Sequence, residues 1–241
     1  MKFSIATAFL CIVFGPFGLL CVVWTFLFLG RAEFLSAVVA LGFAAFTLGM
    51  IAMVVVVASR KVAPRVTCHD GATTLRPDPR VDRFLVVSTI GLFIGMAVYA
   101  VFAPLGMLDI PTPRDDQRYF VFACAAGAVV GVFSVRQIVR QRGTSFLRMS
   151  AQGIELGNTM STAKRSWDEL IEVTDRPRNG KRPTGATYIA TAGGNIRTLP
   201  SDWYTPEGHA LRELVRHYLQ YPEHRAELAD GRAVERLKAV A

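Results

Sequence analysis

The stretch FLSAVVALGFAAFTLGMIAMVVVVAS, residues 34–59, contains no charged side chain. A bilayer core about 30 Å thick is crossed by about 20 helical residues, so this stretch is long enough to span it. Three further charge-free stretches occupy residues 3–29, 84–107 and 119–135. A charge at the centre of a spanning helix costs about 2.5–3.5 kcal/mol, which explains why such stretches exclude them. The chain is therefore predicted to be an integral membrane protein with an α-helical membrane domain of four transmembrane helices in two hairpins.

The distribution of Lys and Arg predicts which way these helices face. The loop between the second and third stretches carries Arg60, Lys61, Arg65, Arg76, Arg80 and Arg83. The loop before residue 119 carries only Arg114 and Arg118, which are offset by three acids. The positive-inside rule then predicts a multi-pass protein of the inner (cytoplasmic) membrane with both termini in the cytoplasm. Because the cations lie where topology places them, the net charge of +8 requires no nucleic-acid partner.

The residue types that catalysis and ion transport need are missing from the four stretches. They contain no Asp, Glu, His, Lys or Arg, the groups with which transporters and membrane-embedded enzymes usually work. Cys11, Cys21 and Cys124 lie in apolar stretches and Cys68 lies alone in a loop, a pattern of reduced thiols rather than of a disulfide framework or a metal site. We expect no enzymatic activity, no metal and no cofactor.

Glycine pairs indicate how the helices pack. Gly91 and Gly95 lie four residues apart in the third stretch, and Gly127 and Gly131 lie four residues apart in the fourth. Glycine at this spacing lets two helix backbones approach closely within a bilayer. The pattern predicts contact between the third and fourth helices through these four residues.

After about residue 143 the pattern changes to short strands separated by turns. Alternating segments occur at residues 145–150 and 153–156, and Trp167, Ile171 and Val173 are spaced to share one face of another strand. Residues 186–192 and 195–199 are predicted to form a hairpin, because the two glycines between them accept positive φ freely.

A helix is predicted to close this region. Thr205, Pro206 and Glu207 are typical of an N-cap, a first-turn proline and an acid near the helix N-terminus. An apolar stripe at helical spacing follows, made of Leu211, Leu214, Val215, Tyr218 and Leu219. Pro222 is expected to end the helix, and the segment beyond residue 228 is predicted to be a weak helix or a mobile end.

This order of antiparallel strands and a closing helix resembles a pleckstrin-homology (PH) domain. Residues 147–156, 167–171 and 221–225 are similar to bacterial PH-domain membrane proteins, particularly actinobacterial ones, over roughly residues 84–228. The resemblance implies a helical hairpin followed by a small α+β cytoplasmic domain, a PH-like antiparallel sheet or partial barrel with a C-terminal helix. It implies no catalytic residues.

A full PH barrel has seven strands, and the sequence shows about five after residue 143. Residues 66–71 and 73–75, in the loop after the second helix, resemble another short hairpin. We hypothesise a degenerate internal duplication of a helix pair plus hairpin, in which the loop hairpin packs against the C-terminal domain. The sequence leaves open whether its strands join the C-terminal sheet.

Two surface features are candidate binding sites. Arg176, Arg178, Lys181 and Arg182 form a basic turn between two strands. A cation near an anionic leaflet contributes about 1 kcal/mol, so this turn suits anionic lipid headgroups, although a solvated hairpin turn has the same composition. Trp203, next to Tyr204, is a candidate partner-binding residue, the alternative being an aromatic pair that caps one end of the barrel.

The predicted organisation has five parts: a first transmembrane helix pair (1–59), a cytoplasmic loop with a short hairpin (60–83), a second helix pair (84–138), a cytoplasmic PH-like domain (143–222) and a helical or mobile tail (223–241). We expect a non-enzymatic scaffold or regulator embedded in the lipid bilayer. Its PH-like domain would bind the anionic membrane surface or an unidentified membrane or cytoplasmic protein. The alternative is a subunit of a lipid or small-molecule transport system, with a path along the glycine-rich third and fourth helices.

Overall fold

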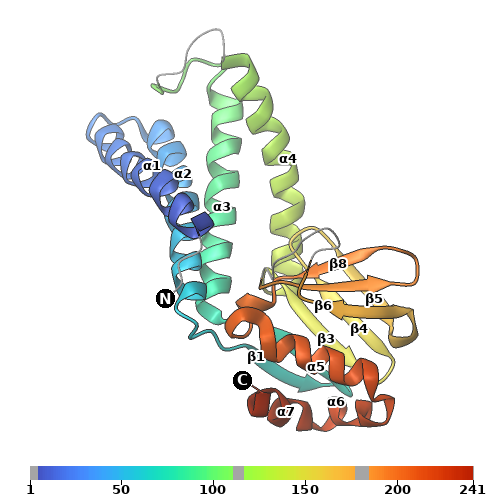
Figure 1. Cartoon of the computed structure of the whole chain (residues 1–241). Coiled ribbons are helices and arrows are strands. Elements are labelled where there is room, and N and C mark those ends of the chain that lie inside the picture. Colours follow the sequence, from blue (N-terminus) through green and yellow to red (C-terminus); the bar gives the residue numbers. More distant parts are fainter. Residues whose placement is uncertain (1–4, 111–116, 177–184, 241) are drawn as a thin grey trace. The chain divides into compact units, whose positions relative to one another are not determined.

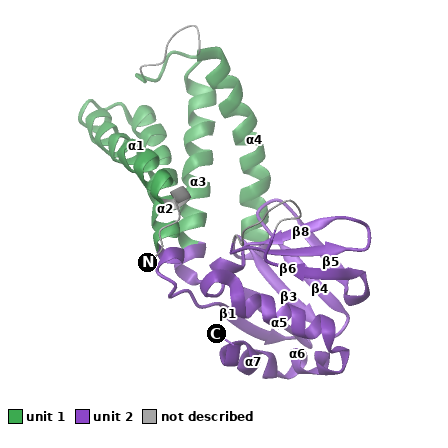
Figure 2. Cartoon of the chain, viewed as in Figure 1, with its two compact units in different colours: residues 1–55, 83–140 green, residues 56–82, 141–241 purple. Residues whose placement is uncertain are grey.

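The computed structural model describes residues 5–110, 117–176 and 185–240, and it divides into two compact units (Figure 2). The helical unit comprises residues 1–55 and 83–140, and the sheet unit comprises residues 56–82 and 141–241. Each unit is thus built from two separate chain segments, and the chain passes between the units three times. Residues 60–82 of the predicted loop and the C-terminal tail, predicted as separate parts, both belong to the sheet unit.

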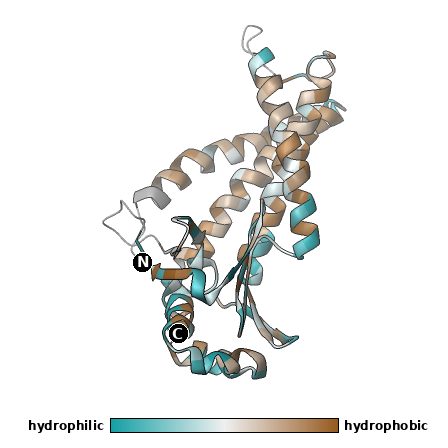
Figure 3. Ribbon diagram, turned by 90° about the vertical axis from the view of Figure 1, so that its right-hand side faces the viewer, coloured by the Kyte–Doolittle hydropathy of each residue, from teal (hydrophilic) through white to brown (hydrophobic). Residues whose placement is uncertain are grey.

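The four predicted transmembrane helices are confirmed as helices long and apolar enough to cross a membrane. They are α1 (Ile5–Gly30), α2 (Phe34–Ala58), α3 (Pro79–Phe102) and α4 (Gln117–Gln141) (Figure 1). Figure 3 shows apolar residues along them.

The third helix begins earlier than its apolar stretch. It starts at Pro79 because Asp78 Oδ1 accepts a hydrogen bond from the backbone N–H of Arg80 at 2.8 Å, which caps the first turn. It ends at Phe102, two residues before Pro104.

Glycines allow close approach between successive helices, but their partners differ from the prediction. The nearest atoms to a Cβ placed on Gly91 or Gly95 all belong to α2, around Gly42. The prediction that these two glycines contact the fourth helix is therefore wrong. On α4, Gly127 and Gly131 instead receive the side chains of Met96 and Phe93 from α3. Four-residue spacing identifies a packing face, and it does not identify the helix that covers the face.

The loop hairpin joins the C-terminal strands in one antiparallel sheet, a point that the sequence left open. The sheet has the order β1-β2-β3-β4-β5. Its strands are β1 (Arg65–His69), β2 (Ala72–Arg76), β3 (Phe146–Ser150), β4 (Gly153–Gly157) and β5 (Thr162–Ser166). The hairpin is attached through β2 and β3, with Thr74 opposite Arg148 and Leu75 opposite Leu147. Leu75 and Leu147 are fully buried.

A second antiparallel sheet contains β6 (Leu170–Thr174), β7 (Thr187–Thr191) and β8 (Ile196–Leu199). The predicted glycine-linked hairpin is β7–β8. The prediction that Trp167, Ile171 and Val173 share a face is wrong. Trp167 begins a 3₁₀ turn, η1 (Trp167–Glu169), and a register irregularity between Leu170 and Glu172 turns Ile171 outward. Among the described strands no pairing joins the two sheets, which do not close into a barrel.

The closing helix α5 (His209–Gln220) carries the predicted apolar stripe into the core, where Leu211, Leu214, Val215 and Tyr218 are at most 2% exposed. It begins later than predicted. Thr205, Pro206 and Glu207 lie around a separate 3₁₀ turn, η3 (Pro206–Gly208), because Glu207 and Gly208 have positive φ. A further turn, η2 (Ser201–Trp203), precedes it.

The C-terminal tail is helical over its described residues and packs on the sheet unit. After the turn η4 (Pro222–Ala226), it forms α6 (Glu227–Asp230) and α7 (Arg232–Val240). Leu228, Ala233 and Leu237 are buried in the core of the sheet unit. Thr73 Oγ1 on β2 donates a 2.7 Å hydrogen bond to the Leu228 carbonyl, so the tail and the loop hairpin contact each other.

Asp82 links three chain segments of the sheet unit. Its carboxylate accepts hydrogen bonds from Arg65 Nη2 at 2.6 Å, and from Thr144 N and Oγ1 at 2.8 and 2.7 Å. Arg65 begins β1, Asp82 lies in the first turn of α3, and Thr144 precedes β3. The Arg65 segment follows α2, Asp82 lies at the start of α3, and the Thr144 segment follows α4. One buried carboxylate therefore connects three segments, each next to a place where the chain passes between the units.

The glycine contacts predict unequal effects of adding one methyl group. A Cβ on Gly42 would lie 2.5 Å from the Gly91 carbonyl oxygen and 3.0 Å from Gly95 Cα, which are backbone atoms that side-chain rotation cannot move. Gly42→Ala is expected to destabilise the helical unit by about 1–3 kcal/mol, the usual cost of overpacking. Gly127→Ala meets only the flexible Met96 side chain and should cost less. Thermal unfolding in detergent checks this order, and equal midpoints for the two variants would contradict it.

Candidate functional site

The outward face of the second sheet is an exposed, partly apolar surface. Glu172, Ala190 and Ile196 lie side by side across the three strands. Ile171 and Ile196 are 66% and 40% exposed, although both are large apolar residues. We call this surface, made of Ile171, Glu172, Thr174, Arg176, Tyr188, Ala190 and Ile196, the outer face.

The outer face is hollowed rather than flat. Its residues line a depression of about 240 Å³. The opposite side of the same sheet packs on the core through Leu170, Val173, Ile189 and Leu199. The sheet thus presents a shallow concavity in which apolar and polar groups lie side by side.

Of the predicted basic turn, the structure describes only Arg176. Its side chain is 62% exposed and lies at the edge of the outer face, with Nε 3.7 Å from Asp175 Oδ1. Asp175 also lies 3.6 Å from the buried guanidinium of Arg212 on α5, so its charge is shared between two arginines. Arg178, Lys181 and Arg182 lie outside the described residues.

The other predicted site residue, Trp203, is half-buried and packs against the core of the sheet unit. Tyr204 is fully buried, and its hydroxyl lies 2.8 Å from Ser145 Oγ. Burial raises the pKa of Tyr204 above its usual value.

The backbone of Trp203 connects to the start of α3. Its carbonyl accepts a hydrogen bond from the Asp78 N–H at 2.9 Å. Burial alone would raise the pKa of Asp78, but hydrogen bonds from Arg80 and Ala63 outweigh it and hold that pKa below its usual range. The surroundings of Trp203 are those of a structural residue at the edge of the core.

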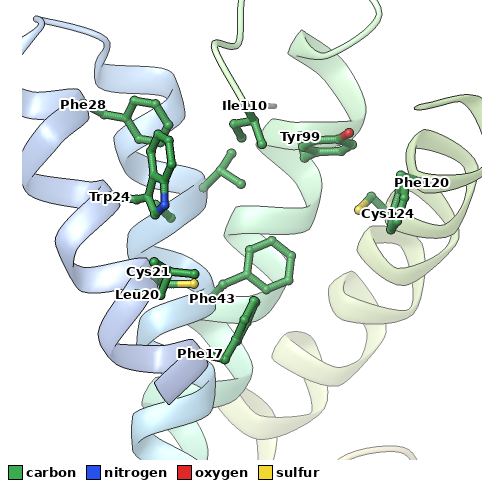
Figure 4. Close-up of a pocket in the computed structure, with 12 residues that line it drawn as sticks. Phe17, Leu20, Cys21, Trp24, Phe28, Phe43, Tyr99, Ile110, Phe120 and Cys124 are labelled. Carbon is green, nitrogen blue, oxygen red and sulfur yellow. The ribbon is translucent and has the colours of Figure 1, made fainter. Parts of the chain in front are cut away.

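A larger cavity, of about 450 Å³, lies within the helical unit, and sequence reasoning missed it. Figure 4 shows side chains from all four helices around it, among them Trp24, Phe28, Phe43, Tyr99 and Cys124. Apolar residues that line a cavity are of the same types as residues that face lipid, so hydropathy gives no signal for it. The buried hydroxyl of Tyr99 has no hydrogen-bond partner among the described residues.

Two histidines that are separate in sequence come together on the sheet unit. His217 Nε2 of α5 lies 2.9 Å from His224 Nδ1 of η4, and the rings stack with their centroids 5.0 Å apart. Burial lowers the pKa of His217, and the positive charges of Arg236 and His224 lower it further. Within the described ranges, no three His, Cys, Asp or Glu side chains are grouped so that they could hold a metal ion.

Comparison of the chain with protein families, curated proteins and solved structures finds no match.

The lowered pKa of His217 predicts a pH effect on stability. Because the pKa of His217 is lower in the folded chain, the imidazole of His217 is protonated at a higher pH in the unfolded chain. The free energy of unfolding should therefore fall as pH decreases through about 6.5. The window from pH 7.5 to 5.5 avoids most carboxylate titration. His217→Gln should flatten the dependence of the unfolding midpoint on pH, whereas His209→Gln, at an exposed position of the same helix, should not. Identical slopes for His217→Gln and the unsubstituted protein would contradict this assignment.

Proposed function

We propose that this chain is a non-enzymatic membrane protein whose sheet unit binds a protein partner through the outer face, in a scaffolding or regulatory role. The observation that carries the proposal is the construction of the sheet unit from segments on both sides of the second helix pair. A domain connected to a membrane helix by a single flexible linker reorients freely. Three chain passages restrict that freedom, and restricted orientation lowers the entropic cost of binding a partner at the same membrane.

We further propose that the sheet unit is a PH-like domain facing the cytoplasm. Two antiparallel sheets followed by an amphipathic helix support this, and β1 and β2 supply strands that the C-terminal segment lacks. The open junction between the two sheets is a departure from a closed PH barrel. The cytoplasmic orientation, in an inner membrane of bacterial type, rests on the positive charges of the loop at residues 60–83.

The chemistry of the outer face indicates the kind of partner. Ile171 and Ile196 offer apolar contact. Arg176 begins a segment whose sequence contains three more cations. Glu172 is the acidic residue of the outer face. A protein segment with apolar side chains flanked by acidic residues complements this arrangement. The depression favours insertion of a side chain over contact with a flat anionic membrane, which remains the competing outcome of the test.

A transport path along the glycine-rich helices, the alternative function, gains no support from the packing. Gly91 and Gly95 face α2 at close range, and Gly127 and Gly131 are covered by Met96 and Phe93. These surfaces hold helices together.

A photo-crosslinking probe tests the proposal in native membranes with the full chain. p-Benzoylphenylalanine at Ile171 should give an adduct with a discrete protein, whereas the same probe at Tyr221, an exposed aromatic residue of the same unit, should not. Arg176→Glu should remove most of that adduct, because it places like charge against an acidic partner. Lys164→Glu, on the exposed edge strand β5, is the matched control and should leave it unchanged.

Adducts with lipid alone at Ile171, or identical protein adducts at Ile171 and Tyr221, would contradict the proposed partner surface.

A further inference from the structure

The C-terminal half of α4 carries apolar and basic side chains on one exposed face. Val129, Val132 and Phe133 are 60–68% exposed, and the arginines at positions 136 and 140 are exposed as well. Counted from Val129, these positions recur at i, i+3, i+4, i+7 and i+11, the spacing of a single face of an α-helix. We call this face the α4 stripe, made of Val129, Val132, Phe133, Arg136 and Arg140.

The opposite side of α4 is the side that packs in the helical unit. Gly131 receives the Phe93 side chain of α3, and Ser134 and Ile138, which follow at helical spacing, are 3% and 5% exposed. The α4 stripe therefore faces away from α3. Because α4 is long and apolar enough to cross a membrane, the apolar part of the stripe faces lipid.

The position of Arg136 along the helix matches the boundary between hydrocarbon and headgroups. Residues 119–135 carry no charge, and Arg118 and Arg136 flank them. At a rise of 1.5 Å per residue these two arginines lie about 27 Å apart along the helix, close to the hydrocarbon thickness of about 30 Å. Arg136 is thus placed at the inner edge of the headgroup layer, and Arg140 about one turn further out.

The two arginines of the stripe have no acidic partner. No Asp or Glu occurs on α4, and within the described part of the chain neither side chain forms an ion pair or a hydrogen bond. Like charges at i and i+4 of a helix repel each other, so an anion bound between Arg136 and Arg140 would remove that repulsion. Helical side chains lean toward the helix N-terminus, which here directs both guanidinium groups toward the apolar part of the stripe.

We propose that Arg136 and Arg140 bind the phosphate of an anionic phospholipid whose acyl chain lies along Val132 and Phe133. Guanidinium groups match phosphate oxygens in bidentate geometry, and the exposed apolar side chains one turn away contact the chain of the same lipid. Phosphatidylcholine is disfavoured because its positively charged choline is repelled by two arginines. The site therefore selects a lipid of net negative charge. It lies on the helical unit and does not depend on the proposed partner surface of the sheet unit.

The test uses the full chain in phosphatidylcholine vesicles with one of two photoactivatable lipids. These are phosphatidylglycerol and phosphatidylcholine, each with the same diazirine near the carbonyl end of one acyl chain. After illumination, mass spectrometry measures the label at each residue. We expect the phosphatidylglycerol probe to label Val132 and Phe133 at least tenfold more than the phosphatidylcholine probe. At Val87, an exposed residue one turn from the single arginine Arg83 of α3, the preference should be clearly smaller.

Substitutions separate a site on the α4 stripe from a general effect of surface charge. Arg136→Gln and Arg140→Gln should each lower the preference at Val132 about fivefold, the usual contribution of one cation near an anionic surface. Arg83→Gln is the matched control, since Arg83 is an exposed arginine near the start of α3, which runs antiparallel to α4, and it should leave the preference unchanged.

Three results would overturn the proposal. The first is equal labelling of Val132 and Phe133 by the two probes. The second is a preference that persists in the double variant Arg136→Gln/Arg140→Gln. The third is a loss of preference in Arg83→Gln as large as that in Arg140→Gln, which would assign the effect to the overall charge of the surface.

Discussion

The buried carboxylate of Asp82 is the interaction on which the arrangement of the sheet unit depends. It accepts hydrogen bonds from Arg65 and from the backbone and hydroxyl of Thr144, and these residues belong to segments that are far apart in sequence. Hydrogen bonds to a charged group contribute about 1.5–3 kcal/mol each, and an unpaired buried carboxylate is strongly unfavourable. The start of β1, the start of α3 and the approach to β3 are therefore held together, which sets β2 beside β3 in register.

That pairing explains why the loop hairpin and the C-terminal region act as a single unit. Leu75 of β2 and Leu147 of β3 enter the same core as the α5 stripe, and Leu228 of the tail accepts a hydrogen bond from Thr73. The membrane helices and the sheet unit are consequently interleaved along the chain rather than consecutive. The three chain passages between the units are the basis of the proposed scaffolding role.

The sequence predicts the parts of this structure that depend on residues close together in the chain. Hydropathy reveals the helices because a bilayer excludes charge, and helical spacing reveals the stripe on α5. It does not reveal the β2–β3 pairing, which depends on long-range contacts, or the outward turn of Ile171, which a register irregularity causes. Arg176 was identifiable from its charge, whereas the apolar part of the outer face was not. The cavity around Tyr99 escapes sequence analysis because its lining matches lipid-facing composition.

Hydrogen exchange of the full chain in detergent tests most directly whether the loop hairpin and the C-terminal strands form one sheet joined at Asp82. We expect amides of β2 (72–76) to exchange as slowly as those of β3 (146–150), and Asp82→Asn to accelerate the exchange of both together. Asp70→Asn is the matched control, since Asp70 is an exposed turn residue with positive φ that asparagine also adopts. Fast exchange of β2 beside slow exchange of β3, in the unsubstituted protein, would contradict the account.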